Sequence, residues 1–324
     1  MPTSSPCVLA SLFIVLLLLY PPSGCVCFRL GKREKDVASI NSDGASTAPA
    51  QVQQWKVPRL SKVVAEAMGH GGDSATSVEC HTADKLMQER GPDNYRKAAA
   101  EYKLLLEKQP NSASLKFKFA DASVSLLRSL TNANAVLIDG VSDSKENRKL
   151  WKTCAFEAYD ILKELHAQEP QNARIHVLMT EAYTYRTSSK GILKAAVTGD
   201  GLTFMRLVDQ IVSRHPTYDA GVPFIFRGAF LLAAPWPLRD VPKAVEAFES
   251  AWEVEPRSLR NNFFLGVSHF HAGSFEAARQ AFERAVGKDV ESVAATEVDV
   301  AEFFRRESRR SLEMTKERID GGMA

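Results

Sequence analysis

The sequence predicts an all-α fold made of repeated helix pairs, and three observations lead to this prediction. From about residue 78 onward, apolar residues recur at spacings of three and four, which is the period of a helix that buries one face. No segment alternates apolar and polar residues in the way a half-buried strand does. Four of the expected helices stop just before a proline, which cannot continue a helix: Pro110, Pro170, Pro216 and Pro256.

The composition agrees with a folded chain that has no strong electrostatic field. Of the 324 residues, 45% are hydrophobic and 25% are charged, and 41 lysines and arginines are balanced by 39 acidic residues. Such a composition excludes a disordered chain and a polytopic membrane protein. A net charge of +2 gives no whole-chain attraction to nucleic acid, so we expect no nucleic-acid partner.

The residues that precede the prolines repeat a pattern of small and large side chains. Before Pro110, Pro170 and Pro256, and before Val290 where a proline would stand, an alanine is followed four residues later by a larger residue, and three residues after that by a third residue on the same face. The sets are Ala98, Tyr102 and Leu105; Ala158, Leu162 and Leu165; Ala244, Phe248 and Ala251; and Ala278, Phe282 and Ala285. Because small residues allow helices to approach closely, we expect these sets to be buried, with Phe282 between its own unit and a final helix.

These sets resemble the second helix of the tetratricopeptide repeat (TPR). The first helix of that repeat is best matched in the last unit, where Leu265-Gly266 is followed by the turn residues Gly273 and Phe275. The likeness covers residues 78–290 and implies a TPR-like α-solenoid of about four to five helix pairs with a concave groove. Residues 192–221 together with 234–256 also resemble the TPR-type T component associated with TRAP transporters.

The chain departs from regular repeats at three places. The prolines stand farther apart than the family's period of about 34 residues, and the excess falls in two polar segments, 131–147 and 187–201. We expect extended loops there, whose function the sequence does not indicate. The residues Pro235-Trp236-Pro237 look like a further insertion between two helices.

Residues 291–324 are expected to form a C-terminal capping helix and a tail. A helix over about 297–318 would present its apolar side chains on one side, with Thr296 as its N-cap. A solenoid needs such a helix to shield its last apolar face. The side chains on that side are Val300, Phe303, Phe304 and Leu312.

The N-terminal residues 1–27 have the pattern of a signal peptide. The apolar run 7–20 would span about 21 Å as a helix, less than the roughly 30 Å of a bilayer core, and Pro21-Pro22 stop it. An uncleaved anchor and a lipidated Cys25 are the alternatives. We expect a mature N-terminus between Cys25 and Lys62.

Residues 28–77 are basic, rich in Ser and Thr and without apolar periodicity, so we expect a disordered linker. Phe28, directly after a plausible cleavage point, resembles the bipartite leaders of secondary plastids. The chain is therefore expected to enter the secretory pathway and to reside in a lumenal, endomembrane or secondary plastid compartment. Membrane contact is expected only through an uncleaved leader.

The sequence contains no motif that indicates catalysis. The glycine-rich residues 69–72 lack the Lys and Ser/Thr of a phosphate-binding loop. His269 and His271 are two apart and point in opposite directions on a helix, which makes a shared metal ion improbable. We expect no enzymatic activity, no catalytic residues, no cofactor and no metal site.

The TPR resemblance implies a protein-binding scaffold or adaptor whose groove is lined by the first helix of each pair. The groove positions carried onto this chain are Asp121, Arg174, Glu181, Tyr185, Arg260 and His271. Two alternatives remain open: a structural subunit of a membrane-associated complex, and a small-ligand carrier with an apolar pocket. The pocket of a carrier would be lined by Phe224, Phe226, Phe230 and Trp236. The sequence indicates neither the identity of the partner nor the oligomeric state.

Overall fold

The computed structural model describes residues 80–141, 144–191, 194–195, 198–287 and 294–321. All of them belong to one compact unit, Val52–Ala324, whereas the other unit, Met1–Gln51, lies wholly outside the described residues. The expected signal peptide, residues 1–27, and linker, residues 28–77, also fall outside them. None of the helices in the described ranges combines the length and the apolar character that a membrane span requires.

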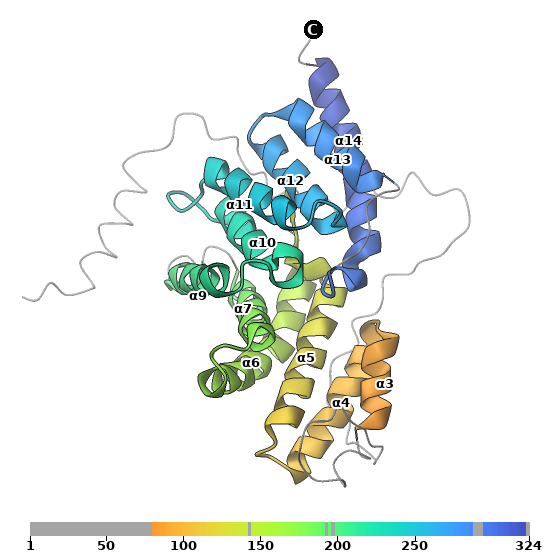
Figure 1. The fold of residues 1–324 in the computed structure, drawn as a ribbon, viewed down its shortest axis with the longest axis vertical. Helices are drawn as coiled ribbons and strands as arrows, with labels where there is room; N and C mark the ends of the chain where they lie inside the picture. The colour runs from red at the N-terminus through yellow and green to blue at the C-terminus, as the bar shows by residue number, and fades with distance from the viewer. Residues whose placement is uncertain (1–79, 142–143, 192–193, 196–197, 288–293, 322–324) are drawn as a thin grey trace, which may run out of the picture. The chain divides into compact units, whose positions relative to one another are not determined.

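The described chain is an all-α solenoid of five helix pairs followed by a capping helix, as predicted. Neighbouring helices pack on one another in chain order (Figure 1). The first helix of each pair is α3, α5, α7, α10 or α12, and the second is α4, α6, α9, α11 or α13. Their bounds are α3 His81–Glu89, α4 Pro92–Lys108, α5 Ala113–Leu130, α6 Lys145–Gln168, α7 Ala173–Ser188, α9 Asp200–Arg214, α10 Tyr218–Ala233, α11 Val241–Val254, α12 Leu259–His271 and α13 Phe275–Val286.

Local sequence explains where these helices begin and end. Four helices end two residues before a proline, as predicted: α4, α6, α9 and α11. Five helices begin after a side chain that accepts a hydrogen bond from the backbone of the first turn, the usual role of an N-cap. These caps are Ser112, Ser144, Asn172, Asp240 and Ser258.

All four predicted sets are buried, on α4, α6, α11 and α13, from Ala98 to Ala285. Two glycines of the first helices show how close the pairs approach. A Cβ atom added at Gly228 or Gly266 would lie 2.6 Å from the ring of Phe248 or Phe282, respectively. In the last two pairs, the glycine of α10 or α12 therefore provides the space that the phenylalanine of α11 or α13 fills.

Segment 131–147 differs from the expectation of a loop without strands. It contains the 3₁₀ turn η1 Asn132–Asn134 and a short hairpin of β1 Val136–Leu137 and β2 Gly140–Val141. The two strands pair antiparallel, with Val136 opposite Val141 and Leu137 opposite Gly140. Two-residue strands are too short to produce a recognisable alternation, which is why the sequence did not reveal them.

The C-terminal cap consists of the 3₁₀ turn η2 Val298–Val300 and helix α14 Ala301–Gly321, which lies beside α13 (Figure 1). Val300, Phe303, Phe304 and Leu312 are buried, and so is Phe282 of α13. The prediction of Thr296 as N-cap was wrong. The helical turn begins after Glu297, and the hydroxyl of Thr296 donates instead to the carboxylate of Asp219.

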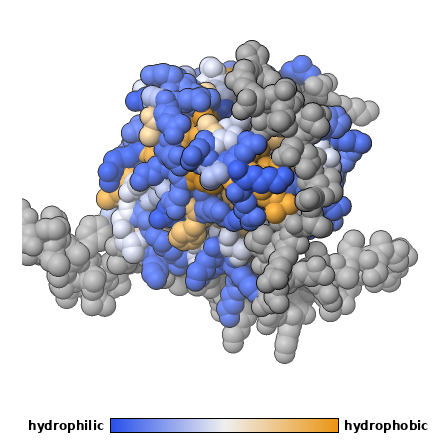
Figure 2. Space-filling view, turned by 90° about the horizontal axis from the view of Figure 1, so that it is seen from below, coloured by the Kyte–Doolittle hydropathy of each residue, from blue (hydrophilic) through white to orange (hydrophobic). Residues whose placement is uncertain are grey.

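The surface is largely polar. Figure 2 shows one face on which hydrophobic atoms appear in separate groups between hydrophilic ones. Among the described residues, three large hydrophobic side chains are markedly exposed: Leu202, Trp236 and Val298.

Candidate functional site

The first helices form the inner layer in which the candidate groove residues lie. Helix α5 packs on α7, and α10 packs on α12. Near the beginning of α7, Arg174 Nη2 lies 2.6 Å from Asp121 Oδ2 on α5, and the Arg174 side chain is 58% exposed. Its guanidinium lies over the ring of Phe117 at 5.0 Å.

Tyr218, at the start of α10, adjoins this exposed pair. Burial raises the pKa of its hydroxyl, the carboxylates of Asp219 and Asp121 add to the rise, and Arg174 opposes it. We call the four residues Phe117, Asp121, Arg174 and Tyr218 the open strip, because they are the accessible part of the inner layer around these candidates.

Deeper in the inner layer, Glu181 and Tyr185 belong to a buried network. Arg128 on α5 donates from Nε and Nη2 to the two carboxylate oxygens of Glu181 on α7, at 2.8 and 2.6 Å. The hydroxyl of Tyr185 donates to Glu181 Oε1 at 2.9 Å. The expectation that Glu181 faces solvent was therefore wrong: its charge holds α5 and α7 together.

Arg260 on α12 is also buried, contrary to the expectation of an exposed groove charge. Its Nη1 lies 3.3 Å from Asp219 Oδ2, and its Nη2 donates to the carbonyl of Asp219 at 2.6 Å. Burial alone would raise the pKa of Asp219, but Arg260 and hydrogen bonds from Thr296 and the Ala295 amide lower it overall. Asp219 thus stays charged and fixes Arg260.

The backbone at Asp219 is strained. Asp219 and Ala220 have φ values of 47° and 56°, in the left-handed region that costs a non-glycine residue roughly 1–2 kcal/mol. Their carbonyl groups accept hydrogen bonds from Arg260 and from the Asn261 side chain. These bonds hold the strained turn in place.

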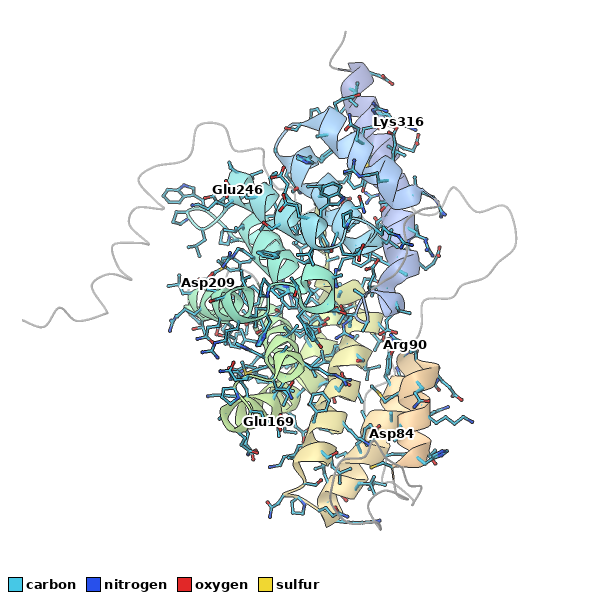
Figure 3. The ribbon with its side chains drawn as sticks, in the orientation of Figure 1. Asp84, Arg90, Glu169, Asp209, Glu246 and Lys316 are labelled. Carbon is cyan, nitrogen blue, oxygen red and sulfur yellow. The ribbon has the colours of Figure 1, made fainter. Side chains whose placement is uncertain are left out.

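Residues 294–300, which we call the return segment, connect the last helix pair to α14 and contact residues of the first two helix pairs. Asp299 accepts a hydrogen bond from Tyr95 of α4 at 2.6 Å and lies 3.3 Å from Arg90 and 3.8 Å from Arg128. Figure 3 shows Arg90 where α3 meets the start of the C-terminal helix. The last unit is thereby tied to the first two.

His271 connects the hairpin to α12. Its Nε2 lies 3.1 Å from the carbonyl oxygen of Leu137 in β1. Burial lowers the pKa of His271, so the ring is neutral at pH 7 and donates to that carbonyl. The hairpin and the return segment thus occupy space that an open groove would leave to a partner.

A cavity of about 180 Å³ remains in the inner layer. Its lining is mainly apolar and includes Phe226, Phe230 and Phe264, with Arg128, Glu181 and Arg260 at its border. The sequence correctly proposed Phe226 and Phe230 as pocket residues. Phe224 and Trp236 do not line it; Phe224 packs in the core, and Trp236 is exposed.

Sequence reasoning missed Arg128, Asp219 and Asp299, which organise the buried charges. A signal existed for Arg128, since it follows Leu126 and Leu127 at the end of a helix whose second half is buried nearly all round. Such a charge needs a buried partner. Nothing local indicated Asp219 or Asp299, because their partners are distant in sequence.

Three histidines meet outside the inner layer, at the ends of α6, α7 and α9. The rings of His166 and His176 are 4.2 Å apart, and those of His176 and His215 are 5.6 Å apart. Burial first, then the neighbouring histidines and Arg214, lower the pKa of His176 to about 4. Within the described residues, no cluster of His, Cys, Asp or Glu is arranged to hold a metal ion.

Comparison with protein-family models supports the repeat assignment for the last part of the chain. The family model of the tetratricopeptide repeat matches residues 236–291. No curated protein matches the sequence. A tetratricopeptide repeat protein of Thermus thermophilus is similar in structure, with a TM-score of 0.48 and 14% identity over 70% of this chain and 96% of that one. Yeast Tom70 has a TM-score of 0.31 and 12% identity over 80% of this chain and 68% of its own.

None of these matches bears on the resemblance to the T component of TRAP transporters. The match at 236–291 covers α11, α12 and α13, where the sets around Phe248 and Phe282 pack as expected. The predicted resemblance is supported where the family model matches: residues 236–291 are similar to the tetratricopeptide repeat family.

Proposed function

We propose that this chain is a non-enzymatic scaffold that binds another protein along the open strip. The fold is in general that of a protein-binding scaffold. The observation that carries the proposal is Arg174, a 58% exposed arginine that stacks on an aromatic ring in the inner layer. The other candidate charges, Glu181 and Arg260, are engaged inside the chain.

The chemistry of the open strip fits an interface. Arginine and aromatic residues are enriched where protein partners bind tightly, because they offer a large contact area together with hydrogen-bond donors. Arg174, Phe117 and Asp121 stand on two packed helices, so little conformational entropy would be lost when a partner binds. Two of the Arg174 neighbours, Phe117 and Asp121, already fix its side chain.

A charge reversal tests this proposal. Arg174→Glu is expected to reduce the yield of co-purified partners by about tenfold or more, the loss typical of an interface anchor. Lys163→Glu, on an exposed position of α6, makes the same change of charge and serves as the control. Quantitative pull-downs in which both variants recover partners at the wild-type yield would contradict the proposal.

We further propose that the protein acts in an exported or secondary plastid compartment. The support is the short apolar run 7–20, which ends in Pro21-Pro22, and the basic, hydroxyl-rich residues that follow it. A fluorescent fusion of the full chain is expected in the endomembrane system or plastid, and deletion of residues 1–27 is expected to leave the fusion in the cytosol. The same location for both fusions would contradict this proposal.

A further inference from the structure

Small residues contribute to the lining of the cavity in the inner layer. Ala229 and Ala233 lie one turn apart on α10, and Gly201 lies near the start of α9. A Cβ at Gly201 would already lie 3.4 Å from the ring of Phe230. The space is therefore lined by small residues between aromatic rings, rather than left by poor packing at one position.

The two long polar segments of the sequence also contribute to this cavity. Ala135, Val136 and Val141 come from segment 131–147, and Ala195 comes from segment 187–201. Asn132, Ala133 and Asn134 have left-handed φ values of 50–55°, a strained turn that directs the hairpin toward the cavity border. Insertions and backbone strain that converge on one cavity are typical of a binding site.

The charged groups at the cavity border are already neutralised. Arg128 is bonded to Glu181, and Arg260 is paired with Asp219. A charged ligand would have to be buried without a counter-ion, which is costly in a mainly apolar environment. The lining therefore selects an uncharged ligand.

The size of the cavity and the residues around it define the ligand further. An apolar cavity of about 150 Å³ is large enough to bind benzene, so about 180 Å³ accepts an apolar molecule of benzene size or somewhat larger. The three exposed hydrophobic side chains, Leu202, Trp236 and Val298, each stand within two positions of a cavity-lining residue. Leu238 comes within 3.9 Å of a Cβ at Gly201, so the loop after α10 meets the start of α9.

We infer that this cavity is a binding site for a small, uncharged, mainly apolar molecule of about one or two rings. This site is separate from the open strip, which contributes no residue to the lining.

Isothermal titration of the full chain with toluene, indole and naphthalene tests the inference, with indole-2-carboxylate as the charged counterpart of indole. At least one neutral probe is expected to bind saturably, and the carboxylate is expected to bind at least about tenfold more weakly. The absence of saturable binding by all three neutral probes, or equal binding of indole and its carboxylate, would overturn the inference.

Two variants locate the binding. Ala233→Leu places additional carbon atoms in the cavity and is expected to weaken binding by about tenfold or more, whereas Ala167→Leu, on the exposed side of α6, leaves it unchanged. If Ala233→Leu does not fold, judged by circular dichroism, Leu238→Ala replaces it: this variant enlarges the cavity and is expected to improve binding of naphthalene relative to toluene. Probe binding that neither variant alters would place the site elsewhere and overturn the inference.

The outcome is distinguishable from that of the proposed scaffold. Arg174→Glu is expected to bind the neutral probe as the wild type does, since Arg174 does not line the cavity. If a captured partner protein displaces the probe, a side chain of that partner occupies the cavity, and the assignment of a small-molecule ligand is overturned.

Discussion

The last two helix pairs and the middle of the chain differ in the side chains that join neighbouring helices. In α10 to α13, glycines and phenylalanines interlock, and the family model matches most of this part directly. In α5 to α9, buried charges such as Arg128 and Glu181 join the helices, and long connections interrupt the repeat. The close glycine–phenylalanine packing thus belongs to the regular part, whereas buried charges occur in both parts: Arg128 with Glu181 in the middle, and Arg260 with Asp219 in the last pairs.

The largest expected effect concerns the charged region. Glu181→Ala leaves Arg128 buried without its bidentate partner and is expected to lower the free energy of unfolding by about 3–5 kcal/mol. The double variant Glu181→Leu with Arg128→Met removes both charges and is expected to regain much of this loss. Urea unfolding of the two proteins measures the difference; equal stability of both would contradict a buried ion pair.

In the regular region, Phe282→Ala is expected to cost about 3–5 kcal/mol, because the ring is fully buried and fills the space above Gly266. The thermal midpoint reports this loss. A midpoint within a degree or two of the wild type would show that the interlocking packing of α12 and α13 does not carry their stability.

A smaller effect is expected when a methyl group is added in the same place. Gly266→Ala brings a Cβ atom to 2.6 Å from the Phe282 ring, so the helices must shift at a cost of about 1–3 kcal/mol. Gly321→Ala is the matched control, since a Cβ there has no neighbour within 4 Å. Chemical unfolding should separate the two variants, and equal stability would argue against close helix approach.

Acid should weaken the middle of the chain through its histidines. Because the folded-state pKa of His176 lies at about 4, below its ordinary 6.5, the unfolded chain binds the proton more readily. The folded state therefore keeps its full stability above pH 7, where His176 is neutral in both states. As the pH falls from about 6.5 toward 4, the free energy of unfolding decreases by on the order of 2 kcal/mol, because the unfolded chain takes up the proton first.

The groups that face His176 are His166, His215, Arg214 and Gln210, of which Arg214 adds to the repulsion of a proton. His176→Leu should flatten the dependence of unfolding free energy on pH, whereas His81→Leu, at an exposed position of α3, should not. If the unfolding free energy of His176→Leu depends on pH as steeply as that of the wild type, the histidine cluster does not cause the loss of stability in acid.

The contrast between the two regions also explains what the sequence could predict. Prolines, N-caps and the sets around Phe248 and Phe282 are local signals, and they predicted the helix pairs, the cap and the buried positions. The excess length of segments 131–147 and 187–201 indicated where the chain is irregular, but not that both segments line a cavity.

The functional positions were harder to predict because their environment depends on distant residues. Glu181 and Arg260 occupy groove positions of the repeat, yet both are buried, because Glu181 pairs with Arg128 and Arg260 pairs with Asp219. Asp299 lies far along the chain from Tyr95 and Arg90, and no local pattern relates them. Among the predicted groove residues, Arg174 is the one whose side chain is mostly exposed, as the repeat implies for such positions.

The most direct test compares Glu181→Gln and Arg174→Glu in parallel, with stability and partner capture measured on the same preparations. Glu181→Gln should lower the thermal midpoint while folded protein still captures its partners, because its carboxylate serves the fold. Arg174→Glu should lose capture with a midpoint close to the wild type, since an exposed ion pair contributes at most about 1 kcal/mol. If Glu181→Gln instead loses capture at an unchanged midpoint while Arg174→Glu retains capture, the division between buried structural charges and an open binding strip is contradicted.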